Sequence, residues 1–212
     1  MVRSPSHAGS FYPADAADLR RTVDEMLDWE EAPTVDVAPA IVVAPHAGYV
    51  YSGPVAAAAY RVLAAVSPRP RRFVLFGPSH FLRFRGLATP SEDVFATPLG
   101  RVAVDAELRD LVEANPAATR YDAAHHREHS LEVQLPFLQV VGGEVTMLPV
   151  LTGDIDSAEA AEVLDETLGS GEVFGVVSSD LSHYLDYETA AGRDRDTARA
   201  IVELRPQDLD GG

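Results

Sequence analysis

The stretch Ile41-Val-Val-Ala-Pro-His-Ala-Gly-Tyr-Val-Tyr-Ser-Gly53 decides the fold of this chain. The apolar residues from Ala40 to Val43 predict a short buried strand, because β-branched side chains pack well on a pleated surface. The strand ends at a proline, and His46 follows directly. An alanine-rich helix is expected next, with Ser52 as its N-cap and Pro54 in its first turn. His46 is thus predicted between a buried strand and a helix, where α/β sheets bind ligands.

Two further apolar strands are predicted to end in polar residues. The segment from Phe73 to His80 reads FVLFGPSH, and the segment from Val173 to His183 reads VFGVVSSDLSH. Because the carboxyl ends of parallel strands meet at one edge of a sheet, the polar residues of all three junctions should gather there. These residues are His46, His80, Asp180 and His183.

Apolar runs alternate with helical patterns along the rest of the chain. Strands are expected at residues 99–104 and 145–151, and helices at 15–29, 157–168 and 187–204. The alternation indicates an α/β protein whose mixed, mostly parallel central sheet is flanked by helices. Nothing in the sequence marks a linker, so one domain spanning residues 1–212 is expected.

The segment from Asp122 to Phe137 contains three of the seven histidines. Leucine spacing predicts a helix from about Ser130, with His129 at its N-terminal edge and Glu132 placed to close a capping interaction. Residues 81–85 alternate in polarity and are expected to form an edge strand or a lid.

The charge balance excludes one class of partner. The chain has 33 acidic and 17 basic residues, a formal charge of 17 − 33 = −16, and every basic residue is arginine. Nonspecific nucleic-acid binding needs clustered positive charge, so nucleic acid is not an expected partner. An acidic, lysine-free surface suits a halophilic protein, because salt screens its self-repulsion. GC-rich codon bias is the equally weighted alternative.

Cysteine and membrane signals are both absent from the sequence. With no cysteine, disulfides and thiolate metal ligands are excluded within these 212 residues. No stretch approaches the roughly 18 apolar residues of a membrane helix, and the first residues lead into no hydrophobic signal region. A cytoplasmic protein without membrane contact is therefore expected.

The residues at the predicted sheet edge favour a metal site by their placement. A lone histidine is more often structural than a ligand, but two imidazoles and a carboxylate at one edge suit non-haem Fe(II). The same set also suits catalytic zinc, so the residues leave the metal open. Ser79 and Ser178 are expected to orient neighbouring histidines, because the sequence around Ser79 is not a serine-hydrolase elbow.

Five motifs in order resemble those of the Memo family. They are Ser6-His-Ala-Gly-Ser-Phe-Tyr12, Ala44-Pro-His-Ala-Gly-Tyr49, Phe76-Gly-Pro-Ser-His80, Glu128-His-Ser-Leu-Glu132 with Gln134-Leu-Pro136, and Val177-Ser-Ser-Asp-Leu-Ser-His183. The family is similar in fold to the class III, LigB-type extradiol dioxygenases, which hold Fe(II) by two histidines and a carboxylate.

The resemblance implies roles for particular residues. His46 and His80 match two metal ligands of the family, and the third family ligand is a cysteine nearer the C-terminus. Asp180 and His183 match residues that line the same pocket, and His129 matches a histidine that faces it. Because this chain has no cysteine, we expect either that it lacks the C-terminal part of the family domain or that Asp180 or His183 completes the site. A missing part would leave a sheet edge unpaired and favour self-association into a homo-oligomer.

Three functions follow from the resemblance and the residues together. The first is an Fe(II) or copper site with redox, dioxygenase-like chemistry on an unidentified small molecule or peptide, in which His183, Asp180 and His129 serve the catalysis. The second is a non-enzymatic binding or signalling module that uses the same cleft. The third is zinc-dependent hydrolysis.

Overall fold

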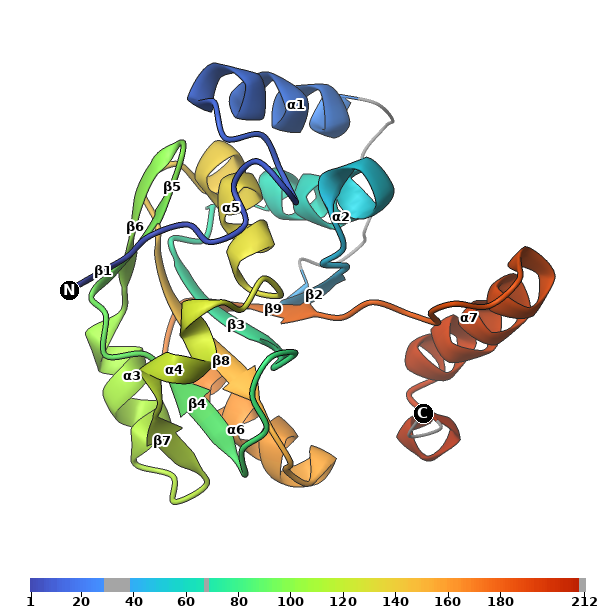
Figure 1. Cartoon of the computed structure of the whole chain (residues 1–212). Helices are drawn as coiled ribbons and strands as arrows, with labels where there is room; N and C mark the ends of the chain where they lie inside the picture. Colours follow the sequence, from blue (N-terminus) through green and yellow to red (C-terminus); the bar gives the residue numbers. More distant parts are fainter. Residues whose placement is uncertain (29–38, 67–68, 210–212) are drawn as a thin grey trace. The chain divides into compact units, whose positions relative to one another are not determined.

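The computed structural model describes residues 1–28, 39–66 and 69–209 (Figure 1). Contacts within the chain divide it into two compact units, Met1–Ser179 and the residues from Asp180 onward. The first unit is a mixed α/β fold with a central, mostly parallel sheet flanked by helices, which confirms the predicted fold class. Trp29, the last residue of the first predicted helix, lies outside the described residues.

The sheet has nine strands among the residues that the structure describes. Its main path runs β1-β5-β6-β8-β3-β9-β2, and β4 pairs with β7 and β8 beside that path. The β5–β6 and β4–β8 pairs are antiparallel, and the other pairs are parallel. The strands are β1 (Val2–Arg3), β2 (Ile41–Ala44), β3 (Arg72–Pro78), β4 (Leu87–Thr89), β5 (Val94–Thr97), β6 (Gly100–Val104), β7 (Ala118–Arg120), β8 (Thr146–Thr152) and β9 (Val173–Ser178).

Helices cover both faces of this sheet (Figure 1). One layer holds α1 (Ala16–Asp28), α2 (Tyr49–Ala65) and α5 (Leu135–Gly142), which pack against one another. The other face carries α3 (Ala106–Glu113) and α6 (Ser157–Gly169). A short helix α4 (Asp122–His126) and the 3-10 turn η1 (Glu132–Gln134) precede α5.

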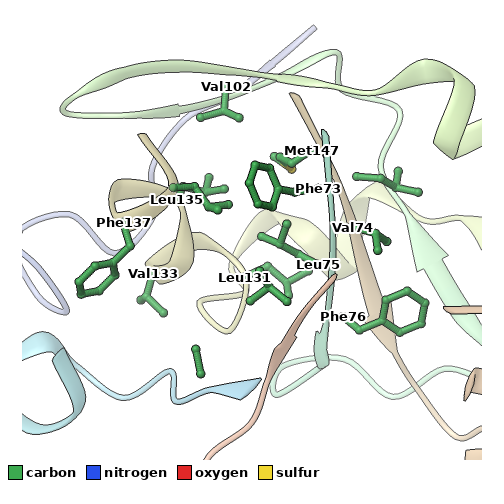
Figure 2. Close-up of a cluster of buried hydrophobic side chains, with 14 of the residues drawn as sticks. Phe73, Val74, Leu75, Phe76, Val102, Leu131, Val133, Leu135, Phe137 and Met147 are labelled. Carbon is green, nitrogen blue, oxygen red and sulfur yellow. The ribbon is translucent and has the colours of Figure 1, made fainter. Parts of the chain in front are cut away.

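Strand β3 lies at the centre of the core. Figure 2 shows Phe73 and Leu75 on the side of β3 that faces Leu131 and Leu135, and Val74 on the opposite side. All of these side chains are buried. Burying a side chain of this size contributes about 1.5–3 kcal/mol relative to leaving it exposed. The two-sided burial explains why the strand reads as a continuous apolar run rather than an alternating one.

The start of α2 corrects one prediction. The helix begins at Tyr49 after Gly48, a turn earlier than expected, so Ser52 is not its N-cap. The Ser52 hydroxyl instead donates a hydrogen bond to the carbonyl of Ala47 at 2.9 Å. Burial of Tyr49 and a hydrogen bond from its N–H to the carbonyl of Phe11 hold the helix start at this earlier residue.

Residues 81–85, which were expected to form an edge strand or a lid, form neither a strand nor a helix. Their regular pairing is limited to an isolated bridge between Arg85 and Asp154. Asp105 caps α3, because its carboxylate accepts a hydrogen bond from the N–H of Leu108.

The second unit contains α7 (Tyr187–Val202) and the 3-10 turn η2 (Pro206–Asp208). Asp186 caps α7 by accepting hydrogen bonds from the backbone N–H and the hydroxyl of Thr189. Across the described parts of both units, every helix is too short or too polar to cross a membrane.

Candidate metal centre

Three neighbouring parallel strands form the base of the candidate site. Strand β9 lies between β2 and β3, with Ala44 opposite Ser178 and Phe76 opposite Val177. Because the three strands run in the same direction, their carboxyl ends meet at one edge of the sheet. His46 and His80 each follow the last residue of their strand by two positions, so both lie at this edge.

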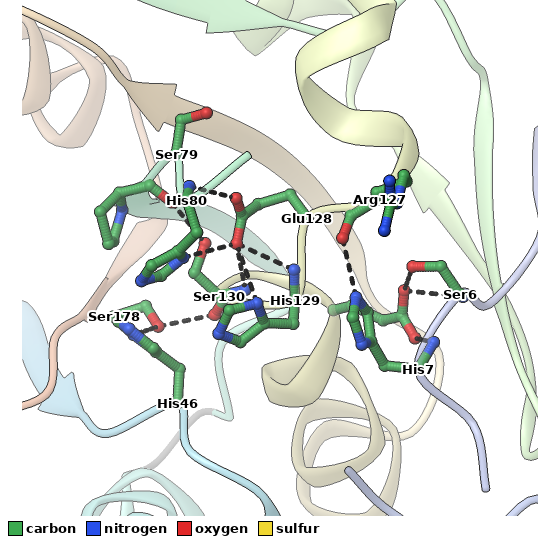
Figure 3. A network of polar contacts seen from close by, with 12 residues as sticks. Ser6, His7, His46, Ser79, His80, Arg127, Glu128, His129, Ser130 and Ser178 are labelled. Atoms are coloured by element: carbon green, nitrogen blue, oxygen red, sulfur yellow. Dashed lines mark hydrogen bonds and ion pairs between the residues drawn. The ribbon is translucent and has the colours of Figure 1, made fainter. Parts of the chain in front are cut away.

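His129 joins these two histidines from a different part of the chain. It lies in the segment between α4 and η1, and its ring stacks on that of His80 with centroids 4.4 Å apart. The ring of His46 lies 5.2 Å from that of His80 and 5.7 Å from that of His129, in edge-to-face arrangements. One ligand nitrogen from each of the three rings lies within 4.8 Å of the others, close enough to bind one metal ion (Figure 3).

A single carboxylate, that of Glu128, contacts two of these histidines (Figure 3). Its Oε1 accepts a hydrogen bond from Nδ1 of His80 at 2.8 Å and lies 3.3 Å from Nδ1 of His129. The latter contact lacks hydrogen-bond geometry. Backbone N–H groups of His80, His129 and Ser130 also donate to this carboxylate.

The third histidine, His46, has its own hydrogen-bonding network. Its Nδ1 lies 2.9 Å from Oγ of Ser178, and that hydroxyl donates its one proton to the carbonyl of Ser130 at 2.6 Å. Ser178 must therefore accept from His46, so Nδ1 of His46 carries a proton. Gln134 also donates to Ser178, and the hydroxyl of Tyr60 fixes the orientation of the Gln134 amide.

Burial and charge set the protonation of two residues at the site. Burial alone would raise the pKa of Glu128, but hydrogen bonds from the His80 ring and from the N–H groups of Ser130 and His80 outweigh it and lower the pKa to about 2. Burial lowers the pKa of His129 to about 4, against the opposing influence of Glu128. At neutral pH the site therefore contains a carboxylate beside a neutral His129 ring.

The N-terminal segment forms one wall of the site. The rings of Phe11 and His7 lie 4.6 and 5.4 Å from the ring of His129, measured between centroids. Phe81 contacts the same ring at 6.1 Å. These side chains place aromatic surface beside His129.

Glu132 holds this segment and does not cap a helix, which corrects the second capping prediction. Its buried carboxylate pairs with Arg3 at 2.6 Å and accepts hydrogen bonds from the hydroxyls of Ser6 and Tyr12. It also accepts from the backbone N–H groups of Ser6 and His7. The carboxylate turns toward the N-terminal segment because a buried charge is favourable only with several partners.

Asp180 and His183 belong to the second unit. Oδ2 of Asp180 lies 3.6 Å from Nε2 of His183, and the histidine side chain is more than half exposed. Their expected roles as pocket residues stay predictions.

The sequence pattern did not identify two residues of this candidate site. Glu128 directly precedes His129, and Gln134 lies five residues after it, yet the sequence predicts no role for either residue. Glu128 contacts His80 across 48 positions of sequence, so only its adjacency to His129 hinted at the site.

The donor set fits a first-row transition metal. Neutral imidazole suits zinc, copper, iron and nickel, and three histidines leave further coordination positions for water or substrate. Ligating histidines commonly donate their other ring N–H to a carboxylate or another polar group, as His80 does to Glu128 and His46 to Ser178.

Comparison with known proteins agrees with the resemblance of the five sequence motifs. The family model described as "Memo-like protein" matches residues 3–211. A MEMO1 family protein of Aquifex aeolicus is 36% identical over 212 residues, which is 98% of this chain and 77% of the relative. One of Methanococcoides burtonii is 40% identical over 213 residues, covering 96% of this chain and 76% of the relative.

Proposed function

The chain belongs to the Memo-like protein family, and from that premise we propose that it binds one Fe(II) or copper ion through His46, His80 and His129. The bound metal serves redox chemistry of the oxygenase type on a small-molecule or peptide substrate. The observation that carries the proposal is the approach of three ligand nitrogens to within 4.8 Å of one another.

Each residue has a defined task in this function. His46, His80 and His129 would hold the ion through their ring nitrogens. The metal supplies the one-electron chemistry that protein side chains lack. Ser178 and Glu128 orient the rings of His46 and His80, while Phe11 and Phe81 pack against the ring of His129.

The placement of His129 favours a ligand role over the catalytic role expected from the sequence. Its ring stacks on His80 and lies near His46, and a third imidazole completes a ligand set without a thiolate. A neutral ring at neutral pH is also the form that binds metal.

Anaerobic titration calorimetry with Fe(II), Cu(I) and Zn(II) tests this function. The whole chain should bind one ion, and His46→Ala, His80→Ala and His129→Ala should each weaken binding strongly. His126→Ala is the matched control, because His126 is exposed on α4. Unchanged metal affinity in His46→Ala would refute the proposal.

Zinc-dependent hydrolysis is the second candidate, favoured by the three-histidine ligand set. Three histidines and one water form a known catalytic zinc site, in which the water ionises near neutral pH. Preference for Zn(II) over Fe(II) and copper in the same titrations, with hydrolytic turnover that requires zinc, would favour this candidate instead.

A further inference from the structure

We propose that Glu128 is the positioning residue of the metal centre: its one carboxylate keeps the ring protons of both His80 and His129 on Nδ1, which leaves the lone pair of each ring on Nε2. The inference rests on the proposed metal-binding function and adds a residue that controls two of the three ligands. Its basis is the set of contacts around a side chain that is only 3% exposed.

Four N–H groups donate to the Glu128 carboxylate. Oε2 accepts from the backbone of His80 at 2.6 Å. Oε1 accepts from the backbones of His129 and Ser130 at 2.9 and 3.0 Å and from the His80 ring at 2.8 Å. An ionised carboxylate only accepts hydrogen bonds, so every one of these partners must be a donor.

This requirement determines the ring proton of His80. The contact with Oε1 places a proton on Nδ1, and a neutral imidazole has one N–H, so in the neutral, metal-binding form of the ring the lone pair lies on Nε2. The Nδ1 of His129 is 3.3 Å from the same oxygen, and a negative charge at that distance favours a proton there over a lone pair. The same carboxylate thus selects the same tautomer in both stacked rings.

His46 provides an internal contrast. Its Nδ1 contacts Ser178, which does not contact the carboxylate of Glu128 in the described network. Loss of the Glu128 carboxylate should therefore affect His80 and His129 together and leave the tautomer of His46 unchanged.

The backbone around Glu128 is anchored independently of the histidines. The guanidinium of Arg3 donates to the carbonyl of Glu128 at 2.8 Å and to the carbonyl of His125 at 2.7 Å. This anchoring holds the carboxylate at the sheet edge before any ion binds, which is the condition for a positioning role.

The first test uses the metal-free whole chain and needs no substitution. Nitrogen-15 NMR of the imidazole rings at neutral pH should show His80 and His129 with the proton on Nδ1. Protons on Nε2 in these two rings would overturn the inference.

The second test compares three variants in the same spectra and in Zn(II) titrations. In Glu128→Gln the negative charge is lost. Both oxygens of the wild-type carboxylate accept N–H groups, so the NH₂ of the new amide must face a donor. In Glu128→Asp the charge remains, but the side chain is one methylene too short to reach the His80 ring. Glu113→Gln is the matched control, since the Glu113 carboxylate is also hydrogen-bonded, to Thr89 and Arg120, and contacts no metal-binding ring.

Both Glu128 variants should weaken Zn(II) binding by roughly 10- to 100-fold, the usual effect of losing an outer partner of a ligand. They should lower the Nδ1–H population of His80 and His129, while Glu113→Gln keeps wild-type tautomers and affinity. Unchanged tautomers and affinity in both Glu128 variants would refute the inference, even if the wild-type protein binds zinc. Conversely, a wild-type protein with the expected tautomers and no affinity for any of the metals would refute the metal-binding function and leave the control of the ring protons by Glu128 intact.

Discussion

The ring of His129 stacks on the ring of His80, with an interplanar angle of 26° and 4.4 Å between centroids. His80 follows the central strand β3, whereas His129 lies on the segment that crosses the sheet edge before η1. The stacking therefore joins two separate elements and brings two potential ligand nitrogens to one place.

The stacking permits a substitution that separates packing from metal binding. His129→Phe retains a flat ring against His80 and removes the ligand nitrogen. We expect the free energy of unfolding, measured in urea, to change by less than about 1.5 kcal/mol, because the substitution retains a flat aromatic side chain. Metal affinity should fall by more than the roughly 10- to 100-fold expected for loss of an outer partner. Wild-type affinity in this variant, measured by calorimetry, would exclude His129 as a ligand.

Ser178→Ala should weaken the orientation of His46. The substitution removes the acceptor of the His46 Nδ1–H and of the Gln134 amide, and leaves the carbonyl of Ser130 without this donor. Unsatisfied buried groups cost about 1–3 kcal/mol, and metal affinity should fall by roughly tenfold or more. Ser170→Ala is the control, because the Ser170 hydroxyl donates to the carbonyl of Thr167 in α6, and Ser170 precedes β9 at the end opposite to Ser178. Equal urea midpoints and affinities for Ser178→Ala and the control would contradict the prediction.

Arg3→Ala should be strongly destabilising. The guanidinium and the Glu132 carboxylate form a buried ion pair, and removal of one partner leaves an uncompensated buried charge that costs about 3–5 kcal/mol. Arg20→Ala breaks an exposed pair with Asp24 on α1 and should cost less than about 1 kcal/mol. Urea unfolding of both variants measures the difference. Similar losses of unfolding free energy in Arg3→Ala and Arg20→Ala would show that the ion pair of Arg3 with Glu132 does not hold the N-terminal segment.

Stability should fall as the pH drops from 6.5 to 4. Burial lowers the pKa of His125 from 6.5 to about 4, so between these values the unfolded chain takes up a proton that the folded protein excludes. Unfolding is therefore favoured at the lower pH, by up to about 3 kcal/mol for this residue. His129 acts in the same direction.

His125→Gln should reduce this pH dependence, because glutamine keeps a donor for the carbonyl of Ala88 and does not titrate. His126→Gln, at an exposed position, should retain the wild-type profile. Thermal or urea unfolding across pH 4–7 provides the measurement. Parallel profiles for His125→Gln and wild type would rule out His125 as the source.

The sequence by itself determined the strand ends that form the base of the site. Apolar runs at Ile41–Ala44, Phe73–Phe76 and Val173–Val177 end in polar residues, and their pattern predicted neighbouring parallel strands. Parallel strands present their carboxyl ends at one edge, so the meeting of His46 and His80 followed from the sequence. The start of α2 did not, because tertiary contacts of Tyr49 with Phe11 and the core override the local capping preference of Ser52.

Only the tertiary structure decided which histidine is the third candidate ligand and which carboxylate contacts two of the three rings. Three histidines crowd into residues 125–129, and local spacing does not distinguish the buried structural ring of His125 from the site residue His129. Glu128 and Glu132 are alike in sequence, yet one carboxylate turns toward His80 and the other toward Arg3. The physical reason is that a buried carboxylate is stable only where hydrogen-bond donors surround it. A donor to Glu128 lies 48 positions away in the sequence, and a donor to Glu132 lies 129 positions away.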